Sequence, residues 1–255
     1  MKKLLAIVLS LVMLLSFAGC GAQKPDSELI KDNGKIVVGI TDYAPMDYKE
    51  KGSDEWTGFD AEFARLFAKE LGVEAEFIEI DWDNKFMELE SKSIDCVWNG
   101  MTITDEAKLN ASVSNAYVKN AQVLVMKADK VADIKKAEDA KDLKFAVEKG
   151  SAGADCAKEA GYKNIVEVGT QGDALMEVKA GTADATIIDI TMANAMTGEG
   201  TSYVELAKGI EYSSEEYGVA FRKESDLTEK LNEFMASIKD GELKKLAEKY
   251  QLTLA

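Results

Sequence analysis

The sequence predicts an α/β protein of two lobes, and three observations support this fold class. Short apolar runs alternate with stretches of helical periodicity, an order typical of a mostly parallel sheet flanked by helices. This alternation occurs twice, roughly over residues 34–122 and 127–217. Apolar strands at 122–126 and 217–221 lie where the two sets meet, with no proline- or serine-rich linker. Two such hinge crossings predict a clamp in which residues 222–255 return to the first lobe.

The elements of the first set follow from apolar periodicity and turn residues. A short apolar run at 35–40, bounded by Gly34 and Asp42, predicts a buried strand. Gly58 opens the next helix and Gly72 ends it. The apolar face of that helix has helical spacing: Phe59, Phe63, Leu66, Phe67 and Leu71. The rest of the set is a strand at 73–80, a short helix at 81–89 and a central strand that begins at Ile94.

The second set and the C-terminus continue the alternation. Strands are predicted at 142–147, 165–168 and 185–189, and helices at 155–160, 173–180 and 190–196. The last strand is expected at 217–221. Two helices with apolar faces follow it, separated by a break at Asp240-Gly241.

The composition argues against several classes of function. The chain has 255 residues and no histidine, which eliminates Ser-His-Asp and Cys-His catalysis. Its formal net charge of −15 argues against a nucleic-acid partner, because binding to phosphates depends on Lys and Arg. Cys96 and Cys156 have no metal-site spacing, so we expect buried, inert thiols. No cofactor and no metal are expected.

Residues 1–20 have the features of an export signal. Basic Lys2-Lys3 precedes an apolar stretch at 4–17, which is too short for a comfortable membrane span. The stretch ends in Ser16-Phe17-Ala18-Gly19-Cys20, which resembles a bacterial lipobox and implies that Cys20 becomes a lipidated N-terminus. The alternative is a plain signal peptide with a coincidental cysteine. The polar residues 21–33 are expected to form a tether.

Residues 94–108, IDCVWNGMTITDEAK, have the pattern of a ligand loop at the end of a strand. The first residues favour a pleated backbone, and Asn99-Gly100 readily turns. Thr102 and Thr104 place two hydroxyls after the turn, and Thr104-Asp105-Glu106 is a helix-start signal. Ligands of open α/β sheets bind outside the carboxyl ends of the strands. An ordinary strand-to-helix loop is the alternative.

This stretch resembles the ligand loop of the polar amino-acid family of ABC-transporter substrate-binding proteins. The family pattern G-x-T-I-T-x-E-R corresponds to Gly100-Met101-Thr102-Ile103-Thr104-Asp105-Glu106 followed by Ala107, and F-S-x-P-Y corresponds to Val113-Ser114-Asn115-Ala116-Tyr117. The resemblance spans essentially all of 35–250. It implies a periplasmic-binding-protein-like clamp that closes around an amino acid, with membrane permease and ATPase subunits as partners. We expect a monomer.

In the first lobe, candidate binding residues follow each of three strands, whose carboxyl ends should converge. They are Tyr43 after the first strand, Trp82 after the second, and Asn99, Gly100, Thr102 and Thr104 after the third. The resemblance implies that the two aromatic residues sandwich the ligand's side chain. The alternative is that either aromatic residue belongs merely to the core or the surface.

In the second lobe, a glycine turn and an aspartate are the candidates. Gly150-Ser151-Ala152-Gly153 precedes a helix whose free N–H groups favour an anion. The resemblance implies that Ser151 and Ala152 help to hold the ligand's carboxylate. Asp189 ends a buried strand, where a carboxylate is costly without a cation. The resemblance implies that it binds the α-ammonium of the ligand; the alternative is a helix N-cap.

Ala107 stands where the family carries an arginine that grips the ligand's carboxylate. The chain's two arginines lie within a first-lobe helix and at the end of the last strand, and neither position is suited to substitute. A carboxylate would rest on the Ser151 helix end and loop amides alone, or a lysine such as Lys85 or Lys119 would reach it, or the ligand has no free carboxylate. The sequence leaves these alternatives open. We expect Ala107 to lie at the cleft and its change to have altered ligand choice.

These features predict a lipid-anchored substrate-binding protein of an ABC importer, on the extracytoplasmic face of the membrane. It would capture a small amine-bearing solute, above all an amino acid, by closure of its lobes. The alternatives are a binder of an amine without a free carboxylate and a sensor lipoprotein. An enzyme on the same fold, such as a dehydratase using Asp189 or Glu148, is disfavoured, because histidine, metal clusters and paired-carboxylate spacing are missing.

Overall fold

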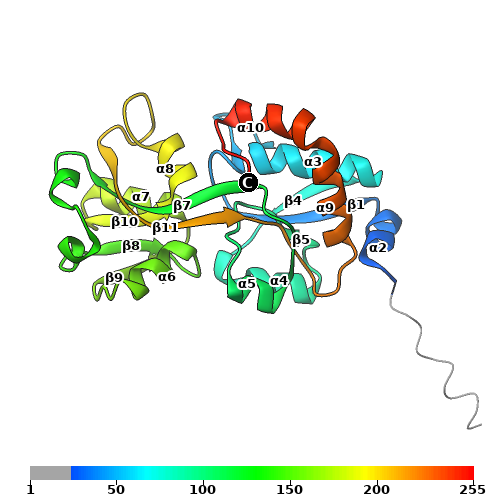
Figure 1. Ribbon diagram of the computed structural model, residues 1–255, viewed down its shortest axis with the longest axis horizontal. Helices are drawn as coiled ribbons and strands as arrows, with labels where there is room; N and C mark the ends of the chain where they lie inside the picture. Colours follow the sequence, from blue (N-terminus) through cyan, green and yellow to red (C-terminus); the bar gives the residue numbers. More distant parts are fainter. Residues whose placement is uncertain (1–23) are drawn as a thin grey trace, which may run out of the picture.

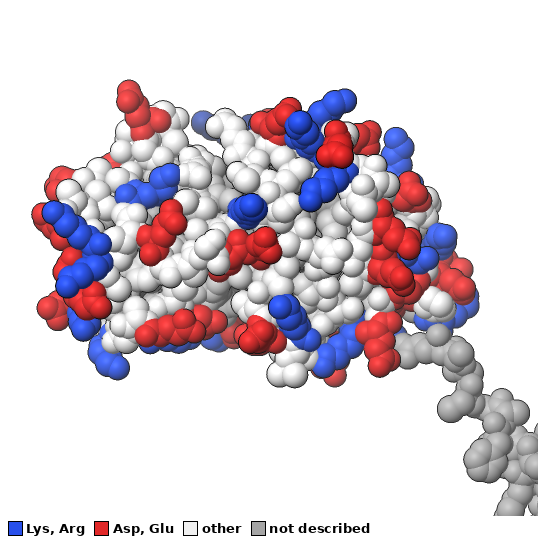
Figure 2. Space-filling view, in the orientation of Figure 1, with Lys and Arg blue, Asp and Glu red and all other residues white. Residues whose placement is uncertain are grey.

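The structure is a computed structural model that describes residues 24–255, so the expected signal peptide and the lipidated Cys20 lie outside the described residues. Two lobes lie side by side, each built on a five-stranded sheet flanked by helices (Figure 1). The predicted two-lobed α/β clamp is therefore confirmed. Among the described helices, none combines the length and the apolar character that crossing a membrane requires. On the face drawn in Figure 2, acidic and basic side chains are interspersed over both lobes.

The first lobe has a sheet of strand order β4-β1-β5-β12-β6. Its strands are β1 (Lys35–Ile40), β4 (Glu74–Glu79), β5 (Cys96–Val97), β6 (Ser112–Val113) and β12 (Ala220–Phe221). Its larger helices are α3 (Phe59–Leu71), α4 (Lys85–Ser91), α5 (Asp105–Asn110), α9 (Leu227–Ile238) and α10 (Lys244–Tyr250). Short elements complete it: β2 (Tyr48–Lys49), β3 (Trp56–Thr57), the 3-10 turn η1 (Trp82–Asn84) and the π-helical turn η4 (Lys239–Leu243). Helices α9 and α10 pack with α3 on this lobe, as the expected return of the C-terminus requires.

The second lobe has a sheet of strand order β11-β7-β10-β8-β9. Its strands are β7 (Val118–Lys127), β8 (Phe145–Glu148), β9 (Ile165–Val168), β10 (Ala185–Asp189) and β11 (Leu206–Tyr217). Its helices are α6 (Ala152–Glu159), α7 (Gln171–Ala180), α8 (Ile190–Met196) and the short 3-10 turns η2 (Val131–Asp133) and η3 (Ala137–Ala140). The sheet is parallel from β10 through β8 to β9, so the carboxyl ends of these strands lie at one edge.

Both sheets are mixed but mostly parallel, as expected, because four of the five strands in each sheet run in one direction and one strand is reversed. In the first lobe β1 is parallel to β4 and β5, whereas β12 runs antiparallel to β5 and β6. In the second lobe β7 runs antiparallel to both β10 and β11. The antiparallel strands are those that pass between the lobes or directly continue such a strand. A chain that crosses and returns must reverse its direction, so the two crossings make each sheet mixed.

Strands β7 and β11 form the connection between the lobes (Figure 1). They pair antiparallel from Val118 opposite Tyr217 to Lys127 opposite Leu206, with irregular register around Glu211. β7 is longer than the apolar run predicted at 122–126. The crossing predicted at 217–221 is wrong in position, because β11 ends at Tyr217, and Ala220–Phe221 form β12 of the first sheet. Polar residues extend both crossing strands, which continue as an antiparallel pair along the edge of the second sheet. The second sheet therefore begins four residues before the predicted end of the first lobe at residue 122.

The expected tether at 21–33 instead contains helix α2 (Asp26–Asn33), which packs on the first lobe. Ile30 is buried in the core, and Asp226 accepts hydrogen bonds from the backbone and the hydroxyl of Ser27. Arg222 forms an ion pair of 3.2 Å with Asp26. The polar composition of this stretch concealed the helix, since a single buried isoleucine and two distant polar partners fix it. The helix ends at Gly34, whose positive φ of 71° suits a glycine.

An aromatic cluster under helix α3 supports the central loop of the first lobe. Phe63 lies edge-on to Trp98, with ring centroids 4.9 Å apart, and Phe59 stacks on Tyr117 at 6.0 Å. Trp98 immediately precedes the Asn99-Gly100 turn, so packing of its ring fixes the turn from below. Close-packed aromatic side chains of this kind give the loop a rigid base.

Candidate ligand-binding site

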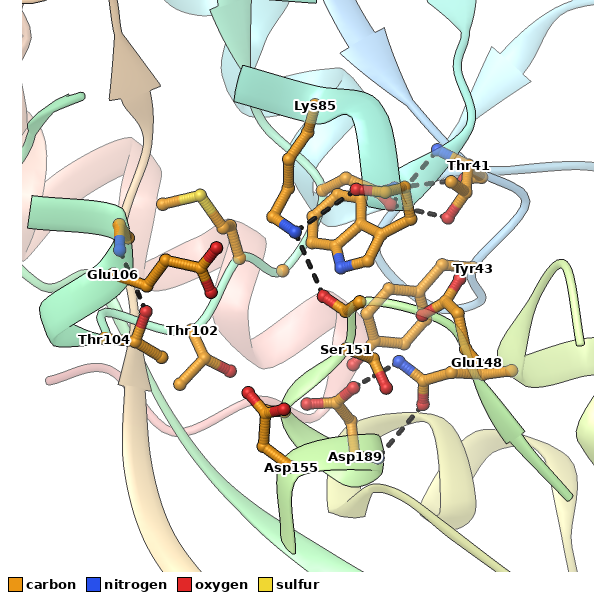
Figure 3. A pocket seen from close by; sticks show the side chains of 18 of the residues that line it. Thr41, Tyr43, Lys85, Thr102, Thr104, Glu106, Glu148, Ser151, Asp155 and Asp189 are labelled. Atoms are coloured by element: carbon orange, nitrogen blue, oxygen red, sulfur yellow. Dashed lines mark hydrogen bonds between the residues drawn. The ribbon is translucent and has the colours of Figure 1, made fainter. Parts of the chain in front are cut away.

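A pocket lies between the lobes, and residues at strand ends of both lobes form its wall (Figure 3). All the candidate binding residues line it: Tyr43, Trp82, Asn99, Gly100, Thr102, Thr104, Ser151, Ala152 and Asp189. The lining also includes five charged or small residues and one amide: Lys85, Glu106, Ala107, Glu148, Asp155 and Gln171. The convergence follows from the parallel strands, whose carboxyl ends face the gap between the sheets.

Tyr43 joins the lobes through its hydroxyl group. It follows β1, and its hydroxyl is hydrogen-bonded to Thr191 of α8 and to Tyr217 of β11, at 2.5 Å each. Burial raises the pKa of Tyr43 well above its usual value, so the hydroxyl remains protonated and able to donate. The resemblance implied a ring that sandwiches the ligand. In the structure this ring lines the pocket while its hydroxyl makes an inter-lobe contact.

Asp189 ends β10 and is held by neutral hydrogen-bond donors. Its carboxylate accepts from Gln122 at 3.0 Å, from the Tyr217 hydroxyl at 2.8 Å, and from the amides of Asn120 and Gln171. It precedes α8, yet its side chain makes no capping hydrogen bond, so the geometry does not support the N-cap alternative. Burial, and then a neighbouring glutamate charge, raise the pKa of Asp189 to about 7.

Glu148 adds a second buried carboxylate to the second lobe. It is the last residue of β8, and only 3% of it is exposed. Burial, followed by the charge of Asp189, raises the pKa of Glu148 to about 8. Among the described residues, neither carboxylate forms an ion pair with a lysine or arginine. Two buried acids at one wall therefore favour a ligand that brings a cation.

Lys85 enters the pocket from the first lobe, on the side opposite Asp189 (Figure 3). It is the first residue of α4, and its Nζ lies 4.9 Å from the centre of the Trp82 ring and 5.0 Å from that of Phe86. The Nζ donates to the carbonyl oxygen of Trp82 at 3.2 Å and to that of Gly150, in the second lobe, at 3.0 Å. Burial lowers the pKa of Lys85.

The Asn99-Gly100 turn is held by polar groups of the first lobe. The Asn99 side chain donates to the Thr41 carbonyl oxygen at 3.0 Å and accepts from the Thr41 hydroxyl at 2.7 Å. Gly100 has a φ of 55°, and a Cβ there would lie 2.6 Å from the Tyr43 ring. A glycine is therefore required both by the left-handed backbone and by the close approach of the tyrosine.

A buried acid pair, Asp47 and Asp60, lies behind this turn. Asp60 accepts from the Gly100 N–H at 2.6 Å and from the Tyr117 hydroxyl at 2.8 Å, and Asp47 accepts from Asn99 at 2.8 Å. The second oxygen of each carboxyl group has no hydrogen-bond partner among the described residues. Burial raises the pKa of Asp60 to about 7, and burial and the Asp60 charge raise that of Asp47 well above its usual value. At least one of the two is protonated near neutral pH.

Like the Tyr43 hydroxyl, the three candidate serine and threonine hydroxyls already have protein partners. Thr104 caps α5 by accepting from the Ala107 N–H at 3.0 Å, and Ser151 caps α6 by accepting from the Ala154 N–H at 3.2 Å. Thr102 donates to Glu215 of β11 at 3.0 Å. Each hydroxyl keeps further capacity to bond, since an oxygen has two lone pairs.

Ala107 lines the pocket and is almost fully buried. The arginines lie elsewhere: Arg222 pairs with Asp26 and Asp95, and Arg65 donates to the Trp56 carbonyl oxygen. Lys119 does not line the pocket, whereas Lys85 does. Among the described residues, Lys85 is therefore the cation that the pocket wall provides.

Sequence reasoning missed the amide side chains that hold Asp189. Asn120 and Gln122 lie on β7, and Gln171 is the first residue of α7. The sequence does contain a signal for such residues, because a polar side chain within an apolar strand such as 121–126 is costly to bury unless it is hydrogen-bonded. Glu148 was considered only as a catalytic acid, and its burial beside Asp189 emerges from the parallel pairing of β8 and β10.

Comparisons with known proteins agree with this geometry. Residues 36–253 match the family of bacterial extracellular solute-binding proteins, family 3. The chain is 33% identical over 260 aligned positions to the arginine-binding extracellular protein ArtP of Bacillus subtilis, covering 98% of each chain. It is 34% identical over 231 positions to the L-cystine-binding protein TcyJ of Escherichia coli K12, covering 87% of this chain and 84% of that one.

Solved structures of amino-acid-binding proteins share the fold. A substrate-binding protein of an amino acid ABC transporter from Streptococcus pneumoniae, bound to L-arginine, matches with a TM-score of 0.81 and 27% identity, over 91% of this chain and all of that one. The ancestral amino acid-binding protein AncCDT-1, a precursor of cyclohexadienyl dehydratase, matches with a TM-score of 0.81 and 32% identity, over 88% and 99% of the two chains. The family resemblance is thus confirmed, and this chain belongs to the bacterial extracellular solute-binding proteins of family 3, among the amino-acid-binding ABC-transporter proteins.

Proposed function

We propose that this protein is the lipid-anchored substrate-binding component of an ABC importer and that it captures a small amine-bearing solute, an amino acid. The observation that carries the ligand class is the pair of buried carboxylates, Asp189 and Glu148, at one wall of the pocket without a cationic partner among the described residues. The binding of arginine, cystine and glutamine by relatives supports an amino acid. The lipobox-like Cys20 supports the anchor, and a permease and an ATPase in the membrane are the proposed partners.

Capture proceeds by closure of the lobes about β7 and β11. The contacts between the lobes include the Tyr43–Thr191 hydrogen bond, the donation from Lys85 to Gly150, and an ion pair of 2.8 Å between Lys149 and Asp83. These contacts form only when the lobes meet, so a ligand that bridges the same gap favours the closed state. A ligand shifts the equilibrium toward the closed state only to the extent that it binds the closed state more tightly than the open one.

A thermal-shift screen of the chain lacking residues 1–20 tests this proposal. The screen uses the twenty amino acids, short amines and dipeptides. A ligand at 100 times its dissociation constant adds about 2.7 kcal/mol of stability, which raises the melting temperature measurably. A rise with at least one amino acid is expected. If no amino acid and no amine changes the melting temperature, and calorimetry also detects no heat of binding, the proposed ligand class is wrong.

A second candidate is a binder of amines that lack a free carboxylate. Ala107 favours it, because its methyl group leaves no guanidinium beside the ligand at that position. Comparison of each amino acid with its decarboxylated amine separates the two candidates. A sensor role without transport is separated by uptake assays of the ligand in cells with and without this protein.

A further inference from the structure

We propose that Lys85 is the carboxylate anchor of this pocket, and that the ligand is a cationic α-amino acid held between Lys85 in the first lobe and Asp189 and Glu148 in the second. The inference deepens the proposed function and rests on it.

The first argument for this proposal is the hydrogen bonding of Lys85. Only 8% of Lys85 is exposed, yet the side chain forms no ion pair with any residue that the structure describes. Two of its three N–H donors reach the carbonyl oxygens of Trp82 and Gly150, and one donor is left. A buried ammonium is costly unless an anion compensates it. A ligand carboxylate supplies that anion.

The second argument is the distance between the buried lysine and the buried acids in the pocket. The acids Asp189 and Glu148 belong to β10 and β8 of the second lobe, and Lys85 belongs to α4 of the first. All line one pocket, but the lysine forms no ion pair with either acid. The wall thus holds the buried acids of the second lobe apart from the buried lysine of the first (Figure 3). A molecule that carries an ammonium and a carboxylate on neighbouring atoms complements both sides and links the lobes.

The beginning of α6 provides further donors next to Lys85. Gly150 accepts from Lys85 and immediately precedes Ser151, the N-cap of α6. The N–H groups of Ala152 and Gly153 have no hydrogen-bond partner among the described residues, and Ala152 lines the pocket. A carboxylate on Lys85 therefore also lies near free N–H groups at a helix N-terminus, which favour an anion. Burial lowers the pKa of Lys85, and such an anion would counteract that effect.

The charge balance of the wall specifies the cationic class. Four carboxylates line the pocket, Glu106, Glu148, Asp155 and Asp189, against Lys85 alone. An α-carboxylate neutralises Lys85, and an α-ammonium neutralises one acid, which leaves an excess of negative charge. Glu106 and Asp155 are exposed and come from opposite lobes, so they flank the mouth of the pocket, where a cationic side chain would lie.

The test compares amino acids with amines that differ only by the carboxylate. Calorimetry measures the affinities of wild type, Lys85→Met and Lys149→Met for arginine and agmatine, lysine and cadaverine, and histidine and histamine. Methionine keeps the apolar stem against Trp82 and Phe86 but removes the charge. Lys149→Met is the matched control, because Lys149 also bridges the lobes, through Asp83, but does not line the pocket.

We expect wild type to prefer at least one of these amino acids over its amine by about tenfold or more. Lys85→Met should abolish or reverse this preference by weakening the amino acid alone, and Lys149→Met should retain it. Lys85→Arg should retain it as well, because the guanidinium still binds a carboxylate.

The inference is overturned if wild type binds an amine as tightly as its amino acid, a result that requires no variant. It is also overturned if Lys85→Met leaves the preference unchanged, or if wild type binds only amino acids without a cationic side chain. These outcomes leave the proposed function intact. Absence of binding to every amino acid and amine would overturn the proposed function itself.

Discussion

Replacement of Asp60 by asparagine should remove part of the pH dependence of stability. Asp60 is fully buried and accepts hydrogen bonds from the Gly100 N–H and the Tyr117 hydroxyl through one oxygen. The amide oxygen of asparagine can accept both. The amide N–H₂ then takes the place of the second oxygen, which has no partner among the described residues. The variant is therefore nearly isosteric and does not titrate.

The magnitude follows from the raised pKa. The pKa of Asp60 is about 7 in the folded protein, compared with 3.8 for a free aspartate. Between these values the folded state binds more protons than the unfolded state, so wild-type stability is fully present below about pH 4 and falls as pH rises toward 7. Each pH unit corresponds to about 1.4 kcal/mol per proton. Over roughly three units the loss is about 4 kcal/mol.

Urea unfolding at pH 4, 5.5 and 7.5 measures this effect. The free energy of unfolding of Asp60→Asn minus that of wild type should be about 4 kcal/mol higher at pH 7.5 than at pH 4. Asp226→Asn is a control that should show almost no pH dependence in this range. Hydrogen bonds from Ser27 lower the pKa of Asp226 despite partial burial, so its linkage to folding lies below about pH 4, and the stability difference between this variant and wild type should stay nearly constant from pH 4 to pH 7.5. A difference between Asp60→Asn and wild type that is the same at pH 4 and pH 7.5 would refute the reasoning.

Three further predictions concern the ligand and the membrane. Asp189→Asn should weaken ligand binding by more than about tenfold, because a buried ammonium loses its charged partner; equal affinities in calorimetry would show that Asp189 does not bind the ligand's cation. Ala107→Arg should raise the preference for arginine over agmatine in the same assay, since it adds a bidentate donor at the pocket wall; an unchanged ratio would contradict its position at the ligand. Cys20→Ser should release the protein from the membrane fraction or leave the signal uncleaved, and unchanged fractionation with unchanged processing would exclude the lipid anchor.

The convergence of the candidate residues could be predicted because it depends on chain order alone. Tyr43, Trp82, Asn99 and Asp189 each follow a strand, and the carboxyl ends of parallel strands meet at one edge. The position of Lys85 could not be decided in this way. Whether its long side chain turns inward or toward solvent depends on the distance between the lobes, and on Gly150 as a partner from the other lobe.

Burial of polar residues was the least predictable feature. Asp47 and Asp60 have the sequence context of surface acids near a turn and a helix start, and only the packing of the loop against α3 removes them from water. Helix α2 was missed for a related reason. Its attachment to the first lobe depends on Asp226 and Arg222, which lie near the other end of the chain. The composition of residues 21–33 alone cannot indicate such distant partners.

The hinge strands contribute directly to the surroundings of Asp189. Asn120 and Gln122 of β7 donate to Asp189 and also to Glu215 of β11, and Tyr217 of β11 donates to Asp189 as well. Bending the two strands during opening therefore alters the solvation of the carboxylate that faces the ligand. By thermodynamic linkage, a substitution in β7 or β11 changes the opening equilibrium and the affinity together, without touching the ligand. Mutational scans of this protein should accordingly find variants of ligand affinity along the hinge as well as around the pocket.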